Sequence, residues 1–200
     1  MTPPPSAQPG SNIAFWILFG LFVLGEYVMQ FRSARDELRH RSGTRVERWS
    51  LLAVVVGVIG GLLGGLGVAE LPAGRVGEAT WPLFILGLVL MAAGIALRQW
   101  AMLVLGRYFT PDVRVHPGQE VIQRGPYRWV RHPSYAGMIV FFLGLGLALS
   151  SWASLLVLAV VPTAGLVVRI RTEERALLAA LGDSYRQFAR GRARLLPGVW

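Results

Sequence analysis

Residues 125–168, GPYRWVRHPSYAGMIVFFLGLGLALSSWASLLVLAVVPTAGLVV, place a polar and aromatic segment directly before two apolar runs. The first run begins at Pro133 and ends near Ser150, and the second extends from Trp152 to Val168. Runs of this length and density are typical of helices that lie in a bilayer. Because almost nothing separates them, they predict a tight antiparallel helical hairpin.

Three further apolar runs precede this hairpin, at about residues 13–31, 49–69 and 81–105. Hydrophobic residues make up 54% of the 200 residues, more than is usual in a soluble domain. Each of these runs is long enough to cross a bilayer as a helix. We therefore predict an all-α, polytopic membrane helix bundle of about five transmembrane helices, with a short C-terminal hairpin and a cytoplasmic helical segment after it.

The two ends of the chain differ from this apolar centre. Residues 1–12 contain four prolines and no ionisable side chain, so we expect a disordered tail there. No basic segment precedes the first apolar run, so we expect no cleaved signal peptide. Residues 169–194 are polar, but their apolar side chains recur at helical spacing and predict a helix. These side chains are Leu177, Leu178, Leu181, Tyr185 and Phe188.

Arginine provides all 20 basic residues, and the net charge is +9. In a membrane protein, this charge is better explained by basic loops that face the cytoplasm and its anionic lipids than by nucleic-acid binding. We therefore expect the lipid bilayer as a partner and no nucleic acid. The chain contains no cysteine, which excludes disulfides and thiolate chemistry. Because His40 and His116 are isolated and no pair has metal-binding spacing, we expect no metal site.

The arginines alternate from one predicted loop to the next. Six lie in residues 32–48, five in 106–132 and seven in 169–194, whereas residues 70–80 hold one and the turn at 150–152 holds none. By the positive-inside rule, this alternation predicts an N-terminus outside and a cytoplasmic C-terminus. The two later polar segments then share the cytoplasmic face, where a site can form between them.

Several residues of the apolar runs have more than one interpretation. The glycines of residues 49–69 include small-xxx-small pairs, which favour close helix packing over a ligand site. They are Gly57, Gly60, Gly61, Gly64 and Gly65. Tryptophans near the predicted span ends are expected to be interfacial anchors. They are Trp49, Trp81, Trp100, Trp129 and Trp152. Glu26 either stabilises helix packing or lines a lipid-facing entrance, and Arg98 either extends to the interface or faces a substrate cavity.

Two clusters contain groups that can carry chemistry. His132-Pro133 begins an apolar run, and proline is favoured in the first turn of a helix, where free N–H groups form an anion site. The alternative is that Pro133 only starts the helix. In the second cluster, Arg169 and Glu173 are four residues apart and share a helix face. Glu173 is suited to hold an ammonium and Arg169 a carboxylate, unless the two form a surface ion pair.

These motifs together carry a resemblance. They are G-P-Y-R-x-x-R-H-P-x-Y-x-G at 125–137, R-x-x-x-E-E at 169–174, L-G-x-x-Y at 181–185 and R-L-L-P ending at Pro197. The pattern resembles the isoprenylcysteine carboxyl methyltransferase family of integral membrane enzymes over about residues 106–200. Membrane phospholipid N-methyltransferases and some thiol S-methyltransferases share the pattern in a modified form, and the likeness to membrane steroid-type reductases is looser.

The resemblance implies a methyltransferase that depends on S-adenosylmethionine. Residues 106–200 are then the cofactor-binding and catalytic region, and residues 13–105 form three further transmembrane helices. The implied cofactor-binding residues are Gln119, Glu120, Val121, Ile122, Tyr127, His132, Pro133, Ser134, Tyr135 and Glu173. The family favours histidine where Gln119 stands. Arg169 and Glu173 are the catalytic candidates, and Arg169 and Arg98 are the substrate-binding candidates.

The methyl acceptor stays open at this point. We expect a lipophilic or small-molecule acceptor, such as the carboxylate of a prenylcysteine, a thiol or a phospholipid amine. An amine acceptor requires a base, for which His132 or Glu174 is the candidate. Two hypotheses from other classes are an NADPH-dependent membrane reductase and a non-enzymatic lipid-binding scaffold.

Overall fold

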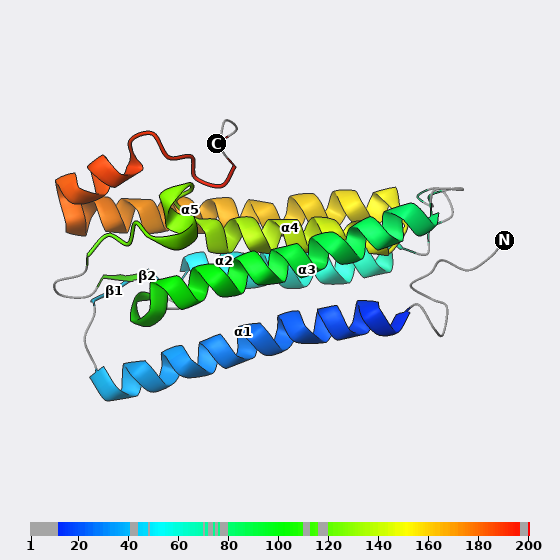
Figure 1. The fold of residues 1–200 in the computed structure, drawn as a ribbon, viewed down its shortest axis with the longest axis horizontal. Coiled ribbons are helices and arrows are strands. Elements are labelled where there is room, and N and C mark those ends of the chain that lie inside the picture. The colour runs from blue at the N-terminus through cyan, green and yellow to red at the C-terminus, as the bar shows by residue number, and fades with distance from the viewer. Residues whose placement is uncertain are drawn as a thin grey trace.

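The computed structural model describes residues 12–40, 44–47, 49–69, 71, 74, 76, 80–109, 113–115, 120–196 and 200. Residues 1–11 of the predicted tail lie outside this part of the chain. The α-helices of the described residues are α1 (Asn12–His40), α2 (Trp49–Gly67), α3 (Thr80–Leu105), α4 (Pro133–Ala148) and α5 (Trp152–Ala189). They lie along one common direction (Figure 1), and α4 and α5 form the predicted hairpin. The predicted all-α membrane bundle is confirmed.

Four helices of the described chain, α1, α2, α3 and α5, have the length and apolar composition needed to cross a membrane. The apolar helix α4 has 16 residues, fewer than the about 20 that cross a hydrocarbon core of about 30 Å. The outer faces of the helices carry exposed leucines such as Leu52, Leu63 and Leu156. Extensive apolar surface of this kind is stable in lipid, so the chain is a multi-pass integral membrane protein.

Glycines bring α2 and α5 into close contact. A Cβ at Gly61 would lie 2.6 Å from Cγ of Pro162, and one at Gly165 would lie 2.5 Å from the carbonyl oxygen of Ala53. These distances leave no room for a side chain, so glycine is what allows the two helices to approach. The buried glycines of α2 are Gly57, Gly61 and Gly65. The predicted packing role of these α2 glycines is confirmed.

A second pair of helices, α3 and α4, is joined in the same way, and the sequence analysis did not single out its glycines. A Cβ at Gly94 would lie 2.5 Å from the backbone nitrogen of Phe141, and one at Gly144 would lie 2.6 Å from that of Met91. Because the nearest atoms belong to backbone, they cannot move aside as the end of a flexible side chain can. The α3–α4 contact therefore tolerates no added volume at these positions.

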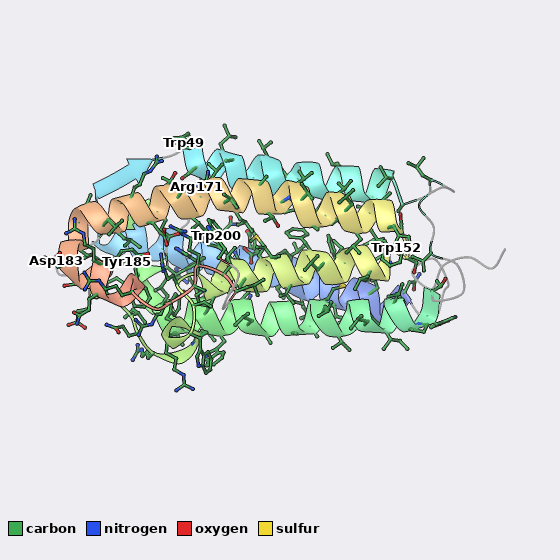
Figure 2. The ribbon with its side chains drawn as sticks, turned by 90° about the horizontal axis from the view of Figure 1, so that it is seen from above. Trp49, Trp152, Arg171, Asp183, Tyr185 and Trp200 are labelled. Carbon is green, nitrogen blue, oxygen red and sulfur yellow. The ribbon has the colours of Figure 1, made fainter. Side chains whose placement is uncertain are left out.

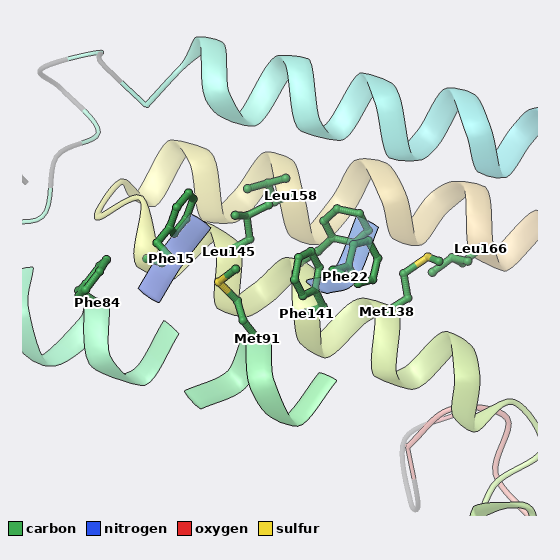
Figure 3. Close-up of a cluster of buried hydrophobic side chains, with 11 residues drawn as sticks. Phe15, Phe22, Phe84, Met91, Met138, Phe141, Leu145, Leu158 and Leu166 are labelled. Atoms are coloured by element: carbon green, nitrogen blue, oxygen red, sulfur yellow. The ribbon is translucent and has the colours of Figure 1, made fainter. Parts of the chain in front are cut away.

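The interior between these helix pairs is filled mainly by aromatic and methionine side chains (Figure 3). Phe22 of α1 stacks on Phe141 of α4, with ring centroids 3.8 Å apart and 8° between the planes. Phe15 and Met29 of α1 are buried as well, whereas most of its other large side chains are exposed. The helix α1 thus docks on the bundle through a narrow apolar stripe, along one outer side in Figure 1.

One end of the bundle carries the polar segments, and we call it the polar end. Here β1 (Thr44–Glu47) pairs antiparallel with β2 (Val113–Val115). These short strands were not predicted, because their segments read as polar loops. Their pairing joins the α1–α2 connection to the α3–α4 connection (Figure 1). The two connections therefore share one side of the membrane, as the arginine distribution predicted.

The helix α5 has 38 residues and continues beyond its apolar part, residues 152–168, into the stretch that was predicted to be helical. It is interrupted at Gly182, whose φ of 53° lies in the left-handed region that glycine adopts readily. The chain then turns back, and residues 190–196, which we call the C-terminal strap, pass beside the start of α4. The backbone amides of Arg131 and His132 donate to carbonyls of this strap at 2.9 Å. No local sequence pattern predicts this return of the chain.

Two of the predicted anchors, Trp49 and Trp152, lie at helix ends, as expected of interfacial tryptophans. Trp49 and Trp152 begin α2 and α5, and each exposes more than half of its surface. Figure 2 shows them toward opposite ends of the bundle, with Tyr185 and Asp183 at the polar end.

Candidate active site

A cavity lined by charged, aromatic and aliphatic side chains opens at the polar end, between η4 (Gly125–Arg128), the first turn of α4 and the polar part of α5. We call it the first cavity. Most of the predicted site residues line it. They are Glu120, Val121, Ile122, Tyr127, His132, Ser134, Tyr135, Arg169 and Glu173. Pro133 is instead buried at the first position of α4, and Gln119 lies outside the described residues.

The turn η4 holds Tyr127 in the cavity wall. Gly125 has a φ of 58°, and a Cβ there would lie 2.9 Å from Val104, so only glycine fits the start of this turn. Pro126 and Tyr127 are buried behind it. Burial, and then the charge of Glu173, raises the pKa of Tyr127 well above its ordinary value. Its hydroxyl is therefore protonated and able to donate a hydrogen bond.

The start of α4 confirms one prediction and corrects another. Pro133 is the first helical residue and His132 is the cap, as predicted. The amides of Tyr135 and Ala136, however, both donate to the carbonyl oxygen of His132 at 3.1 Å, and Pro133 has no N–H. Most of the predicted N–H anion site is thus used within the chain, and the prediction of such a site was wrong for these groups.

The side chain of His132 is buried beneath the cavity. Its ring stacks on that of Tyr135, with centroids 5.7 Å apart. Nδ1 lies 4.0 Å from Glu173 Oε2, and Nε2 is buried with no hydrogen-bond partner among the described residues. A buried imidazole nitrogen without a partner is unusual in a protein interior.

Tyr135 joins the two polar segments. Its hydroxyl donates to Glu173 Oε2 at 2.8 Å and accepts from Arg169 Nε at 3.4 Å. Arg169 also donates through Nη1 to Ser50 Oγ of α2 at 3.0 Å. Arg169 is 4% exposed, which contradicts the alternative of a surface ion pair. The expected meeting of residues from either side of the hairpin is therefore present in the structure.

The next residue, Glu174, does not line the first cavity and lies between two arginines. Its carboxylate accepts from Arg131 at 2.9 Å and from Arg194 of the strap at 2.8 Å. Nε2 of His132 lies 3.4 Å away without the geometry of a hydrogen bond. Burial alone would raise the pKa of Glu174, but the neighbouring side chains of His132, Arg194 and Arg131 outweigh it and lower the pKa to about 2. Glu174 is thus a poor proton acceptor, which argues against its suggested role as a base.

Other residues of the first cavity were missed by the sequence analysis. They are Leu105, Tyr108, Phe109, Arg131, Leu177, Leu181, Tyr185 and Phe188. Tyr185 is 3% exposed, and its hydroxyl has no partner among the described residues. Burial, followed by the charges of Glu174 and Glu173, raises the pKa of Tyr185 far above its ordinary value. The motif L-G-x-x-Y at 181–185 contained this signal, but no role was assigned to its tyrosine.

A second cavity adjoins the first. It encloses about 400 Å³ and is lined mostly by apolar side chains of α1 and α2, a volume within the range of small-molecule sites. Glu26 and Arg98 belong to its wall, and Phe109, Tyr135 and Arg169 line both cavities. Arg98 is 5% exposed and pairs with Glu26, so the alternative that it extends to the interface was wrong.

The fold and the cavities define a class of protein. It is a multi-pass helical membrane protein with a charged cavity at one end of the bundle and an apolar cavity beside it. Residues 85–179 match the model described as the isoprenylcysteine carboxyl methyltransferase family. The resemblance inferred from the motifs is confirmed.

Individual relatives span different functions. The chain is 36% identical over 129 residues to methanethiol S-methyltransferase of Mycobacterium tuberculosis, covering 63% of this chain and 50% of that one. It is 30% identical over 121 residues to protein-S-isoprenylcysteine O-methyltransferase A of Arabidopsis thaliana, covering 60% and 61%. It is 32% identical over 110 residues to the uncharacterized protein YpbQ of Bacillus subtilis, covering 55% and 64%. The chain thus spans less than two thirds of the length of these relatives.

Proposed function

We propose that this protein is a membrane methyltransferase that uses S-adenosylmethionine and transfers its methyl group to a lipophilic acceptor. The observation that carries the proposal is the pair of adjoining cavities, one charged and one apolar, that share Phe109, Tyr135 and Arg169. A polar ligand in the first cavity and an apolar ligand in the second would meet at these side chains. The family whose model matches residues 85–179 supplies the reaction type.

The first cavity fits the cofactor in its chemistry. Glu173 provides a carboxylate for an ammonium group, and Tyr127 is a buried hydroxyl donor. Tyr185 Oη is a buried polar atom without a partner in the described chain, and a ligand with hydroxyl, carboxylate or ring-nitrogen groups would satisfy it. Glu120, Val121, Ile122, Ser134 and Tyr135 complete the set that we propose holds it.

The bound cofactor supplies an electrophilic methyl group on a sulfonium. The task of the protein is then alignment of the reacting groups and exclusion of water. Tyr135 is held from both sides, by Glu173 and by Arg169, so its ring forms a fixed wall where the cavities meet. We assign Arg169 the orientation of an anionic acceptor, because its guanidinium lies at this shared wall.

The second cavity favours a lipophilic acceptor over methanethiol as substrate. Its walls come from α1 and α2, whose outer faces are exposed to lipid, and an apolar tail can enter sideways between them. An ionised carboxylate or thiolate needs no base. A phospholipid amine does need one, and Glu174, held by two arginines with a pKa of about 2, is unsuited to it.

We also propose the orientation given by the arginine distribution, with the N-terminus outside and the polar end in the cytoplasm. The strand pairing at the polar end supports this by placing the loops after α1 and α3 together. The cofactor then reaches the first cavity from the cytosol.

A ligand panel on the detergent-solubilised protein tests the proposal. S-adenosylhomocysteine is expected to raise the melting temperature, whereas NADPH and flavins are not. Stabilisation by NADPH instead would identify a reductase, and stabilisation by none of them would favour the lipid-binding scaffold. Methyl transfer from labelled S-adenosylmethionine to a prenylcysteine, a long-chain thiol, methanethiol and a phospholipid amine then ranks the acceptors.

A further inference from the structure

Arg98 is the single charged residue in the sequence of α3, and its guanidinium is shared between two other helices. Nε and Nη2 form a two-pronged ion pair with the carboxylate of Glu26 in α1, with Nη2 and Oε2 2.6 Å apart. Nη1 donates to the carbonyl oxygen and to Oγ of Ser134 in α4, at 3.1 and 2.8 Å. Both prongs of the guanidinium are therefore engaged.

This bridge lies between the two cavities. Glu26 and Arg98 line the second cavity, and Ser134 lines the first. Ser134 directly precedes Tyr135, which forms part of both walls. One guanidinium thus links α1 to the residue beside the meeting point of the cavities.

The ion pair is also the most specific contact of α1. Its membrane part also contacts the core through the apolar side chains of Phe15, Phe22 and Met29, and the Gln99 side chain of α3 packs against the backbone of Gly25. Between helices in a bilayer, apolar contacts have little advantage over contacts with lipid tails, whereas a two-pronged ion pair fixes both distance and orientation. A buried ion pair adds little to stability compared with apolar residues of similar volume. Its geometry therefore supports a positional role.

We propose that the bridge Glu26–Arg98–Ser134 positions α1 against α4 and so sets the width of the acceptor cavity between α1 and α2. This inference rests on the proposed function, because the cavity is taken as the acceptor site. Glu26 and Arg98 are positioning residues. Arg98, which the sequence analysis offered as substrate-binding, acts in this scheme through Ser134 and Glu26.

The kinetic test separates acceptor binding from turnover. Glu26→Gln keeps the size of the side chain and removes its charge, and we expect the KM for a long-chain acceptor to rise about fivefold or more. The kcat and the affinity for S-adenosylhomocysteine should stay within about twofold, because Glu26 does not line the first cavity. Glu26→Asp keeps the charge and should give a smaller rise in KM. Leu24→Ala, on a lipid-exposed position of the same helix, is the control and should change none of the three.

A distance measurement tests the same bridge without methyl transfer. Because the chain contains no cysteine, spin labels can be placed at Leu21→Cys in α1 and Leu63→Cys in α2, both exposed. Glu26→Gln should broaden and lengthen the distribution of distances between them in lipid nanodiscs, and Glu26→Asp should do so less. An unchanged distribution, or an unchanged acceptor KM, would overturn the proposal.

The two measurements also separate this inference from the proposed function. If the unmodified protein neither binds S-adenosylhomocysteine nor methylates an acceptor, the proposed function fails, and the label distances still show whether the bridge holds α1. If Glu26→Gln lowers kcat and cofactor affinity as much as it raises KM, the role is general stability and the positioning proposal is wrong.

Discussion

The two parts of α5 are held by opposite kinds of contact. Its apolar part fits against glycines of α2, with Pro162 and Gly165 facing Gly61 and Ala53. Its polar part is held by charged and hydroxyl groups, of which Tyr135–Glu173 joins residues 38 positions apart in the chain. The first kind of contact depends on shape and tolerates no added volume. The second depends on pairing of charges, so its side chains can be changed singly without separating the helices.

The largest effect is expected where a side chain is added to a shape-dependent contact of the same kind, between α3 and α4. Gly94→Leu places a side chain where even a Cβ would lie 2.5 Å from the backbone of Phe141. Overpacking of a core costs about 1–3 kcal/mol and more where backbone must move. We expect little folded protein in size-exclusion chromatography. Gly20→Leu is the matched control, because a Cβ there meets nothing within 4 Å. Equal yields of the two variants would contradict the close α3–α4 packing.

Loss of the cavity carboxylate is expected to act on binding rather than on folding. Glu173→Ala removes the proposed partner of the cofactor ammonium, and hydrogen bonds to charged groups contribute about 1.5–3 kcal/mol. The affinity for S-adenosylhomocysteine should fall about 10- to 100-fold, measured by calorimetry on the solubilised protein. An unchanged affinity would remove Glu173 from the cofactor site.

Arg169→Ala should lower methyl transfer to the acceptor much more than it lowers the affinity for the cofactor product. We expect methyl transfer to fall about tenfold or more, since an oriented charge at the reacting group is lost, while the affinity for S-adenosylhomocysteine changes by less than about threefold. Single-turnover kinetics and calorimetry on the same preparation measure both quantities. Equal losses would argue for a structural role of the contact with Ser50.

A smaller effect on cofactor affinity is expected at Tyr185, whose buried hydroxyl has no partner among the described residues. Tyr185→Phe removes an unpaired buried group, so the melting temperature of the ligand-free protein should be unchanged or raised. The affinity for S-adenosylhomocysteine should fall about 2- to 10-fold, as expected for one hydrogen bond. Tyr27→Phe, at an exposed position of α1, serves as control. A lower melting temperature with unchanged affinity would show that the hydroxyl has a partner within the protein.

The smallest effect concerns acid stability. The pKa of Glu174 is lowered from 4.5 to about 2, so its contribution to stability is present above pH 4.5 and is lost as the pH falls toward 2. The stability of the unmodified protein should therefore decline more steeply between pH 5 and pH 3 than that of Glu174→Gln. Parallel melting curves of the two proteins over this range would show that the contacts of Glu174 with His132, Arg194 and Arg131 do not govern acid sensitivity.

The helices and the motif residues could be predicted because their signals are local. Apolar runs gave the positions of the helices, although α1 continues to His40, past the predicted end at residue 31, and His132-Pro133 gave the start of α4. The spacing of Arg169 and Glu173 gave their common helix face. Long-range pairing could not be predicted in the same way. Glu26 and Arg98 are 72 positions apart, and nothing local indicates that α1 and α3 face each other there.

The same reasoning explains the remaining differences. The strands β1 and β2 are short, and each depends on a partner from another loop, so neither segment has a pattern of its own. The C-terminal strap follows a turn at Gly182, and a single glycine in a helical pattern does not give the direction in which the chain continues. Gly94 and Gly144 lie in apolar runs where glycine has no distinct signal until the facing helix is known.

The shortness of α4 has a consequence for where a reaction takes place. Its 16 residues rise about 24 Å at about 1.5 Å per residue, about 6 Å less than a hydrocarbon core of about 30 Å. If the hairpin turn beside Trp152 sits at one interface, His132 at the other end of α4 lies below the opposite headgroup plane. Under the proposed function, a lipid acceptor therefore need not be lifted into the cytosol to be modified. The protein would bring its water-soluble cofactor down to the depth at which the acyl chains begin.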